Sequence, residues 1–397
     1  MHGHALAPLL LSVYIALLGI GIIVPVMPVY AVSLGATGFT LGLIIAAFSV
    51  SRGLCQPFFG SLSDRFGRKL FLVLGLLVYA LVGLAIPQAT SLTGLIAIRA
   101  LHGVGSAMIV PVAMAYVGDH APDGQEGRNM SLLNIAIFSG MGSGPLLGGI
   151  CVDLWGMQAA FYAMAGMSGL ALVLVLRLLP TTTSGRGTRT SRIGLLTAMG
   201  SMLSSRRTAG LLLARMATMI IMVPTMAFLP LLMQQWFQAS GMWIGLVISA
   251  RTLVNAMLQT PCGRMADRGD KVRLLRIGTL IIVGVMCLTP LAGNCWWLLM
   301  LFVVLGMGEA LIWPTLGALA TEEGRGYGQG TMMGVYNLAM SCGVFLGAIG
   351  AGLSSDIFGL SWSFVCIGAI VFFLTMGASV LIGSSKRASV CGTDRHV

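Results

Sequence analysis

Long runs of apolar residues, separated by short polar connections, extend along the whole chain. A hydrocarbon core about 30 Å thick needs about 20 apolar residues per helix, and twelve runs reach that length. Their approximate limits are 6–31, 40–61, 70–88, 93–117, 130–151, 158–179, 208–235, 242–263, 272–292, 296–320, 330–353 and 362–382. The pattern predicts an all-α integral membrane protein with twelve transmembrane helices. The first run lacks a basic leader and a small-residue cleavage site, so we expect it to remain as a span.

The composition excludes a water-soluble globule. Of the 397 residues, 57% are hydrophobic and 9% are charged, whereas about 25% are charged in an average soluble protein. Eight cysteines lie mostly inside apolar runs and form no C-x-x-C pair. We interpret them as packing residues rather than metal ligands.

Positive charge gathers in the connections between the runs. With the N-terminus in the cytoplasm, 19 of the 23 Lys and Arg fall in cytoplasmic connections or at the span ends that border them, four lie deep within spans and none lies in an outer loop. Because cytoplasmic loops carry an excess of Lys and Arg, both termini are predicted to be cytoplasmic. We expect a multi-pass protein of the cell membrane, in bacteria the inner membrane. The net charge of +11 then records orientation, and no nucleic-acid partner is expected.

Residues 180–207 form the longest polar stretch and divide the spans six and six. The stretch is rich in Thr, Ser, Gly and Arg, which is typical of a flexible linker. The predicted domains are an N-terminal six-helix bundle (1–179), this cytoplasmic linker (180–207) and a C-terminal six-helix bundle with a short cytoplasmic tail (208–397).

The two halves resemble each other at a fixed offset. A shift of 203 residues aligns residues 60–156 with the second half without a gap, and polar residues coincide as well as glycines. Examples are Asp64 with Asp267, Gln56 with Gln259, Pro111 with Pro314, Asn134 with Asn337, and Asp153 with Asp356. Parallel repeats of this kind predict two pseudo-symmetric bundles with a substrate site between them at mid-membrane.

Four motifs carry a family resemblance. They are LGIGIIVPVMP (18–28), GSLSDRFGRK (60–69), RALHGVGSA (99–107) and GMGSGPLLGG (140–149). Together they resemble the motifs of the major facilitator superfamily (MFS), and within it those of the 12-span drug:proton antiporters. The resemblance covers nearly the whole chain. It implies the MFS fold, alternating access and proton-driven export of small amphiphilic compounds or drugs.

The resemblance also implies residue roles. Arg99 is expected to take part in proton coupling, and Pro25 and Pro28 are expected to bend the first helix. The gating residues are Gly60, Asp64, Arg65, Gly67, Arg68, Gly144, Pro145, Gly148 and Gly149. The second copy of the loop motif departs from the pattern, with Asp270 where the first copy has Gly67.

Charged residues inside the spans are costly and need a reason. Glu309 is the one deeply placed acid, and it is the first candidate for a proton-titrating group. The alternative is a carboxylate permanently paired with an arginine. Asp119, near the inner end of the fourth span, is a weaker candidate. His102 lies one turn from Arg99 and is a further one, although a packed, neutral histidine is favoured.

Polar stripes mark the expected substrate cavity. Arg251, Asn255 and Gln259 recur every four residues in the eighth span, and Arg52 and Gln56 repeat the spacing in the second. Such stripes face the protein interior or water. Five further residues are candidates for the cavity, and four of them have an alternative role. The alternative is an interhelical hydrogen bond for Asn134 and Asn337, core packing for Trp313, and snorkelling of the side chain to the membrane surface for Arg215. The fifth candidate is Tyr336, next to Asn337.

The balance of buried charge leaves the substrate open. Four intramembrane arginines face one glutamate, which favours an anionic, zwitterionic or neutral substrate, and Arg52 and Arg251 are the expected ligands of a carboxylate or phosphate. The alternatives are therefore a facilitator or symporter of organic anions, and a lipid or lysolipid translocase. No catalytic triad, metal cluster or phosphate-binding loop occurs in the sequence, so we expect no enzyme, cofactor or metal. The expected partners of a monomer are a small-molecule substrate, protons and membrane lipids.

Overall fold

The computed structural model describes residues 6–120, 126–180, 195–327 and 329–393. Their regular secondary structure is helical, and twelve helical segments are long and apolar enough to cross a membrane. The prediction of an all-α protein with twelve spans is confirmed.

The spans form two sets of six. The N-terminal half consists of α1 (Leu6–Ile23), α2 (Val26–Ser33), α3 (Gly38–Phe66), α4 (Arg68–Ala85) with the short η1 (Ile86–Gln88), α5 (Leu92–His120), α6 (Glu126–Trp155) and α7 (Met157–Leu178). The C-terminal half consists of α9 (Arg206–Ile220), η2 (Pro224–Phe228), α10 (Leu229–Phe237), α11 (Gly241–Arg268), α12 (Lys271–Leu288) with η3 (Thr289–Leu291), α13 (Cys295–Tyr327), α14 (Gln329–Phe358) and α15 (Leu360–Thr393).

Proline shapes the two spans that open the halves. The first span breaks into α1 and α2 at Pro25, as its sequence predicts, because a proline interrupts the helical hydrogen-bond ladder. The seventh span continues from α9 into α10 through a π-helical segment that begins at Pro224. By contrast, α6 is a single helix through Pro145, one of the expected gating residues, so this structure contains no break there.

The predicted linker is partly helical. Its residues 195–204 form α8 (Leu195–Ser204), whereas the sequence predicts a flexible stretch throughout 180–207. The segment LLTAMGSMLS contains Leu, Ala and Met residues, which favour a helix, whereas the rest of the predicted linker is rich in Thr, Ser, Gly and Arg. Met202 is fully buried. The linker residues 181–194 lie outside the described residues.

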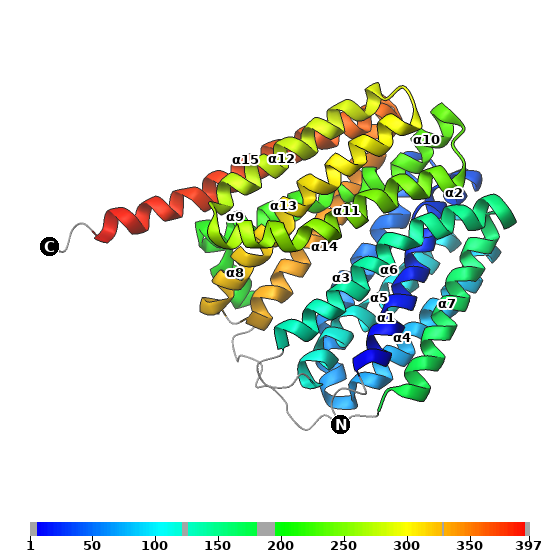
Figure 1. The fold of residues 1–397 in the computed structure, drawn as a ribbon, viewed down its shortest axis with the longest axis horizontal. Coiled ribbons are helices and arrows are strands. Elements are labelled where there is room, and N and C mark those ends of the chain that lie inside the picture. The colour runs from blue at the N-terminus through cyan, green and yellow to red at the C-terminus, as the bar shows by residue number, and fades with distance from the viewer. Residues whose placement is uncertain (1–5, 121–125, 181–194, 328, 394–397) are drawn as a thin grey trace.

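The halves meet through two helix pairs, α3 with α14 and α6 with α11. Figure 1 shows the two halves lying together near α2 and α10 and spreading apart toward the end of the molecule where α1 begins. We call the membrane side that holds the start of α1 the terminal side, and the opposite side, which holds the starts of α3 and α11, the far side.

One stripe on α3 shows where the halves separate. At about 100° per residue, Gly42, Gly53 and Gly60 fall on the same face. Backbone of α14 lies directly against Gly42, and Ser341 of α14 would be 2.9 Å from a Cβ on Gly53, whereas no atom lies within 4 Å of that position on Gly60. The helices α3 and α14 therefore diverge between residues 53 and 60, and the interface opens toward the terminal side.

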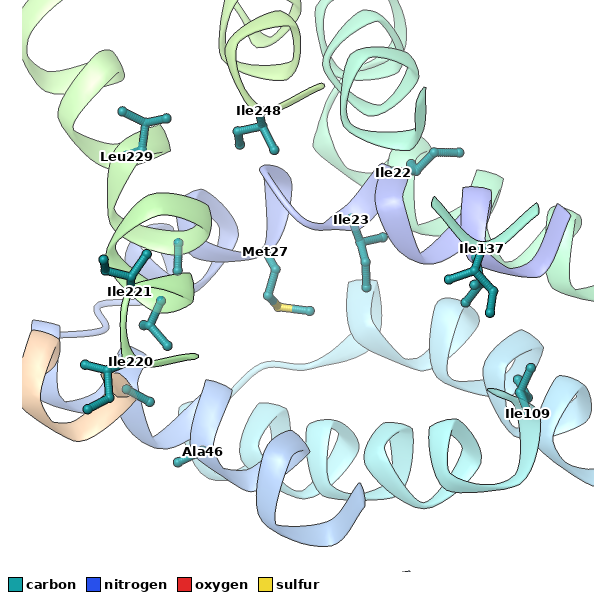
Figure 2. Close-up of a cluster of buried hydrophobic side chains, with 14 of the residues drawn as sticks. Ile22, Ile23, Met27, Ala46, Ile109, Ile137, Ile220, Ile221, Leu229 and Ile248 are labelled. Atoms are coloured by element: carbon teal, nitrogen blue, oxygen red, sulfur yellow. The ribbon is translucent and has the colours of Figure 1, made fainter. Parts of the chain in front are cut away.

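An apolar layer that spans both halves fills the interior toward the far side. Figure 2 shows Met27 of α2 lying between Ile23, at the end of α1, and Ile221 of the C-terminal half, with Ile248 of α11 nearby. All four side chains are at most 4% exposed. Because close-packed apolar side chains leave no room for water, this layer seals the far side of the interface.

Candidate functional site

A buried ion pair lies in the C-terminal half. The guanidinium of Arg251 on α11 donates two hydrogen bonds to the carboxylate of Glu309 on α13, one of them from Nε to Oε2 at 2.9 Å. Its Nη1 donates to Thr225 Oγ1 at 2.6 Å, on the π-helical segment of the seventh span. Arg251 is 1% exposed and Glu309 is 4% exposed. The pair therefore joins three spans in an environment that excludes water.

The structure places Arg251 and Glu309 by the same packing that it uses in the N-terminal half. The backbone of Arg251 lies against Gly306 of α13, and the backbone of Phe48 lies against Gly103 of α5 in the same way. These positions are related by the 203-residue shift. The residue that corresponds to Glu309 is Ser106. The two halves thus share one backbone arrangement but carry different side chains in it.

A second polar cluster lies at this level of the N-terminal half. Arg99 on α5 donates from Nη1 to Nδ1 of His102 at 2.8 Å, and its guanidinium lies 4.6 Å from the ring centre of Phe48. His102 is fully buried between the rings of Phe48 and Tyr79. Because a guanidinium can only donate, Nδ1 must accept, so His102 is neutral with its proton on Nε2. The neutral, packed histidine that the sequence favours is the arrangement found.

Arg52 lies beside this cluster on α3. Its face is set by its neighbours: Ser49 and Gly53 contact Ser341 of α14, Ser51 lies against α5, and Leu54 is exposed at 70%. At about 100° per residue, Arg52 points into the sector between α5 and α14, which faces the half interface. Its Nε has no hydrogen-bond partner among the described residues.

The other predicted cavity residues occupy different environments. Asn255 is 1% exposed and accepts from Gln259 Nε2 at 3.0 Å, so this part of the stripe is enclosed. Trp313 packs against Phe138 of the other half, with ring centres 6.2 Å apart. Gln56 is half-buried and lies one turn after Arg52, on the same interface-facing sector of α3.

Two further predicted residues pair with each other. The guanidinium of Arg215 lies 4.7 Å from the ring centre of Tyr336, and its Nη2 contacts Sδ of Met340 at 3.1 Å. This arginine is therefore held by α14 rather than snorkelling to the membrane surface. Asn134 is half-buried and Asn337 is exposed.

The predicted gating loop is a tight turn at the terminal side. Gly67 joins α3 to α4 with φ of 92°, a conformation that favours glycine. The next residue, Arg68, donates from Nε to Asp119 Oδ2 at 3.0 Å and from Nη1 to Ser63 Oγ at 2.6 Å. Arg65 is exposed, and the side chain of Asp64 lies outside those described. Asp119 thus holds the end of α5 to this turn.

The same pair recurs in the second half. Lys271 and Glu322, which correspond to Arg68 and Asp119 at the 203-residue shift, form an ion pair at 2.9 Å. This geometry favours a structural role for Asp119, which its position in the sequence makes a weaker candidate for proton coupling.

Two aspartates that the sequence analysis assigned no role close the far side. Each accepts two backbone hydrogen bonds from the first turn of a helix in the other half. The contacts are Gly38 N to Asp356 Oδ1 (2.7 Å), Phe39 N to Asp356 Oδ2 (2.8 Å), Gly241 N to Asp153 Oδ1 (2.7 Å) and Met242 N to Asp153 Oδ2 (2.8 Å). Carboxylates are stabilised at helix N-termini. The signal was present in the repeat, where acids occupy equal positions at the far ends of two spans.

The motif GMGSGPLLGG (140–149) packs α6 against two helices, α1 in the same half and α11 across the closing surface. Backbone of α1 lies directly against Gly144 and Gly148, and backbone of α11 lies against Gly149 and Pro145. A Cβ on these glycines would overlap main-chain atoms. Among the residues that the structure describes, no group of three or more His, Cys, Asp or Glu side chains could hold a metal ion.

Two pseudo-symmetric six-helix halves, closed at one end and parted at the other around buried charges, define the class of membrane transporters built from repeats. A profile of the Major Facilitator Superfamily matches residues 9–235 and 211–392. The chain belongs to the Major Facilitator Superfamily, and the resemblance stated from its motifs is confirmed.

Individual relatives agree with this assignment. The chain is 27% identical to an uncharacterised MFS-type transporter of Methanocaldococcus jannaschii over 365 residues, which cover 91% of this chain and 94% of that protein. It is 31% identical to the quinolone resistance protein NorA of Staphylococcus aureus over 178 residues, 44% of this chain and 46% of NorA. Its fold matches a bacterial homologue of the human lysosomal transporter Spinster, solved in an inward-facing and unoccupied conformation, with a TM-score of 0.80, 14% identity and 97% of each chain covered.

Proposed function

We propose that the protein is a proton-coupled antiporter that exports a small amphiphilic compound by alternating access. The Arg251–Glu309 pair carries this proposal, because Glu309 is a carboxyl group that the spans bury away from water. A buried charge pair is stable only while both partners are charged. Protonation of Glu309 would remove the counter-charge of Arg251 and change the packing of the three spans that the pair joins.

The charge distribution supports the orientation that the proposed export requires. The clusters of Lys and Arg predict that the terminal side is cytoplasmic, so the opening between α3 and α14 faces the cytoplasm. Compounds would enter there and leave when the far side opens. The similarity of nearly half the chain to NorA supports a drug-like substrate.

The test is flux in proteoliposomes with and without an imposed pH gradient. The probes are norfloxacin, a zwitterion, ethidium, a cation, and pyrenebutyrate, an anion. For a transported probe, we expect a gradient to drive accumulation in the wild type. In Glu309→Gln, which keeps a hydrogen-bonding side chain of the same size, accumulation should fall to the level without a gradient while exchange between loaded vesicles continues.

The matched control is Glu323→Gln at the terminal end of the same helix. Glu323 also pairs with an arginine, Arg207, at 3.3 Å, but it lies outside the central layer and should leave gradient-driven flux unchanged. The proposal is wrong if no probe moves faster than in protein-free vesicles, or if Glu309→Gln retains gradient-driven accumulation.

A further inference from the structure

The N-terminal half contains more buried hydrogen-bond donors than acceptors. Three nitrogens have no hydrogen-bond partner among the described residues: Nε of Arg52, Nε of Arg99 and Nε2 of His102. All three are donors, since the bond from Arg99 leaves the ring proton of His102 on Nε2. A buried donor without an acceptor is unfavourable, so the cluster is suited to a group that supplies acceptor oxygens.

Among the described residues, no carboxylate forms an ion pair or hydrogen bond with Arg52, Arg99 or His102. The acidic residues of the N-terminal half lie at or beyond the ends of its spans; they are Asp64, Asp119, Asp123, Glu126 and Asp153. Of these, Asp119 is engaged by Arg68 and Asp153 by the start of α11. The charges of Arg52 and Arg99 are therefore unneutralised within the membrane, where an isolated charge is costly.

The pseudo-symmetric half shows that the fold does not require this charge. The residue that corresponds to Arg52 is Asn255, and the one that corresponds to Arg99 is Phe302. In that half Arg251 is neutralised by Glu309, and the other intramembrane arginine, Arg215, lies over the ring of Tyr336. The same helix packing thus exists in one half without a charge at the two positions that Arg52 and Arg99 occupy in the other.

Arg52 is placed where a compound can reach it. It lies on the sector of α3 that faces the half interface, next to Gly53, and α3 parts from α14 between Gly53 and Gly60. The far side beyond it is sealed by the apolar layer around Met27. A group that entered from the terminal side would meet Arg52 at the end of the opening, with Arg99 and Phe48 behind it.

We infer that Arg52 binds the anionic group, a carboxylate or phosphate, of an amphiphilic substrate, and that Arg99 supports it through its positive field. This inference rests on the proposed function and adds the substrate class. It divides the work between the halves: the N-terminal half holds the negative charge of the substrate, and the C-terminal half carries the proton. Arg251, which its sequence position made an equal candidate for binding the anion, already has its carboxylate.

The test is binding to the purified full-length protein in a non-ionic detergent, read as stabilisation against heat over a concentration series. The probes are pyrenebutyrate and its methyl ester, which share the apolar body and differ in the charge. The variants are Arg52→Gln, Arg52→Lys and, as a matched intramembrane control, Arg215→Gln.

We expect the wild type to bind pyrenebutyrate at least about tenfold more tightly than the ester, since hydrogen bonds to charged groups are the stronger ones. Arg52→Gln should lose that preference and keep its affinity for the ester. Arg52→Lys and Arg215→Gln should retain the preference. Equal binding of acid and ester by the wild type, or an unchanged preference in Arg52→Gln, would overturn the inference.

A competition arm distinguishes two sources of the anion. Oleoyl lysophosphatidate and oleoyl lysophosphatidylcholine share an acyl chain but only the first has a net negative charge. If lysophosphatidate displaces pyrenebutyrate at a lower concentration than pyrenebutyrate itself requires, the anionic group belongs to a lipid; otherwise it belongs to a small organic acid. Failure of the charge preference leaves the proton test with Glu309→Gln untouched, because that test reads gradient-driven flux of any transported probe.

Discussion

Asp153 and Asp356, which are 203 residues apart, close the far side by the same contact. Each carboxylate accepts two backbone hydrogen bonds from the first turn of a helix in the opposite half. The two contacts lie on separate helix pairs, α6 with α11 and α3 with α14. Opening the far side requires both to break, so the two aspartates set the stability of the closed arrangement.

Removing the charge of both aspartates should favour opening of the far side. Charges at helix N-termini contribute about 0.3 to 1 kcal/mol each, so Asp153→Asn with Asp356→Asn should shift the equilibrium by about 0.6 to 2 kcal/mol, or about 3- to 30-fold. Spin labels at Leu154 and Met242, exposed residues of opposite halves, should report a larger population of long distances. Asp270→Asn is the control, because Asp270 caps α12 within its own half; an equal shift in this control would contradict the prediction.

A methyl group added to a glycine of the closing surface should lower the stability of the protein, whereas one added to a glycine without close neighbours should not. Gly149→Ala and Gly352→Ala place a Cβ against the backbone of the other half, and overpacking of this kind costs about 1 to 3 kcal/mol. Gly284→Ala, on a helix with no atom within 4 Å, should be neutral or stabilising. Thermal unfolding in detergent checks the order of the three variants. Similar melting temperatures for all three would show that the closing surface adapts.

The buried ion pair should behave differently when one partner or both are removed. Glu309→Ala leaves Arg251 buried without a counter-charge, which costs about 3 to 5 kcal/mol. Replacing both residues, Arg251→Met with Glu309→Leu, should recover most of that stability, because an apolar pair of similar volume packs well. Thermal unfolding measures the recovery, and gradient-driven flux should remain absent in the double variant. Recovery of both stability and coupled flux would remove Glu309 from the proton pathway.

One substitution can reduce the difference in buried charge between the two halves. Ser106 is 4% exposed and corresponds to Glu309, so Ser106→Asp would supply the N-terminal half with a carboxylate near Arg99. We expect the preference for pyrenebutyrate over its methyl ester to fall by at least about tenfold, since the carboxylate competes for the same cations. Ser106→Asn has the same size without the charge and should retain the preference; loss in both variants would point to a packing effect.

Much of the fold follows from the sequence because the bilayer acts as a uniform solvent. Apolar length is enough to locate a span, and prolines mark positions where a helix can break, as the first span does at Pro25 but not at Pro28. The π-helical segment at Pro224 is not predictable in this way, because Pro145 sits in an unbroken helix. Packing around each proline decides the outcome, and a single sequence does not contain that information in local form.

The site was predicted residue by residue but not in its pairings. Arg251 and Glu309 were recognised as intramembrane charges, yet they lie 58 positions apart on different helices, and only the structure shows which arginine meets the carboxylate. The repeat contains a further indication of this arrangement. Gly103 and Gly306 occupy equivalent positions, and the backbones of Phe48 and Arg251 pack against them, which places Phe48 and Arg251 at the same depth in their halves. Phe48, Tyr79 and Thr225 were not identified, because uncharged residues in apolar runs are common.

The closure of the far side depends on main-chain atoms meeting at Gly149, Gly241 and Gly352, and this has a consequence for how such a protein diversifies. Positions that form the closing surface tolerate one residue type, whereas those that face the opening, such as Arg52 and Gln56, do not touch that surface. Selection for a new substrate can therefore change the residues that face the opening without disturbing the surface on which the halves close. In a scan of all substitutions, the closing positions of α6, α11 and α14 should tolerate few residue types and their neighbours many. The same fold can then evolve different substrate specificities.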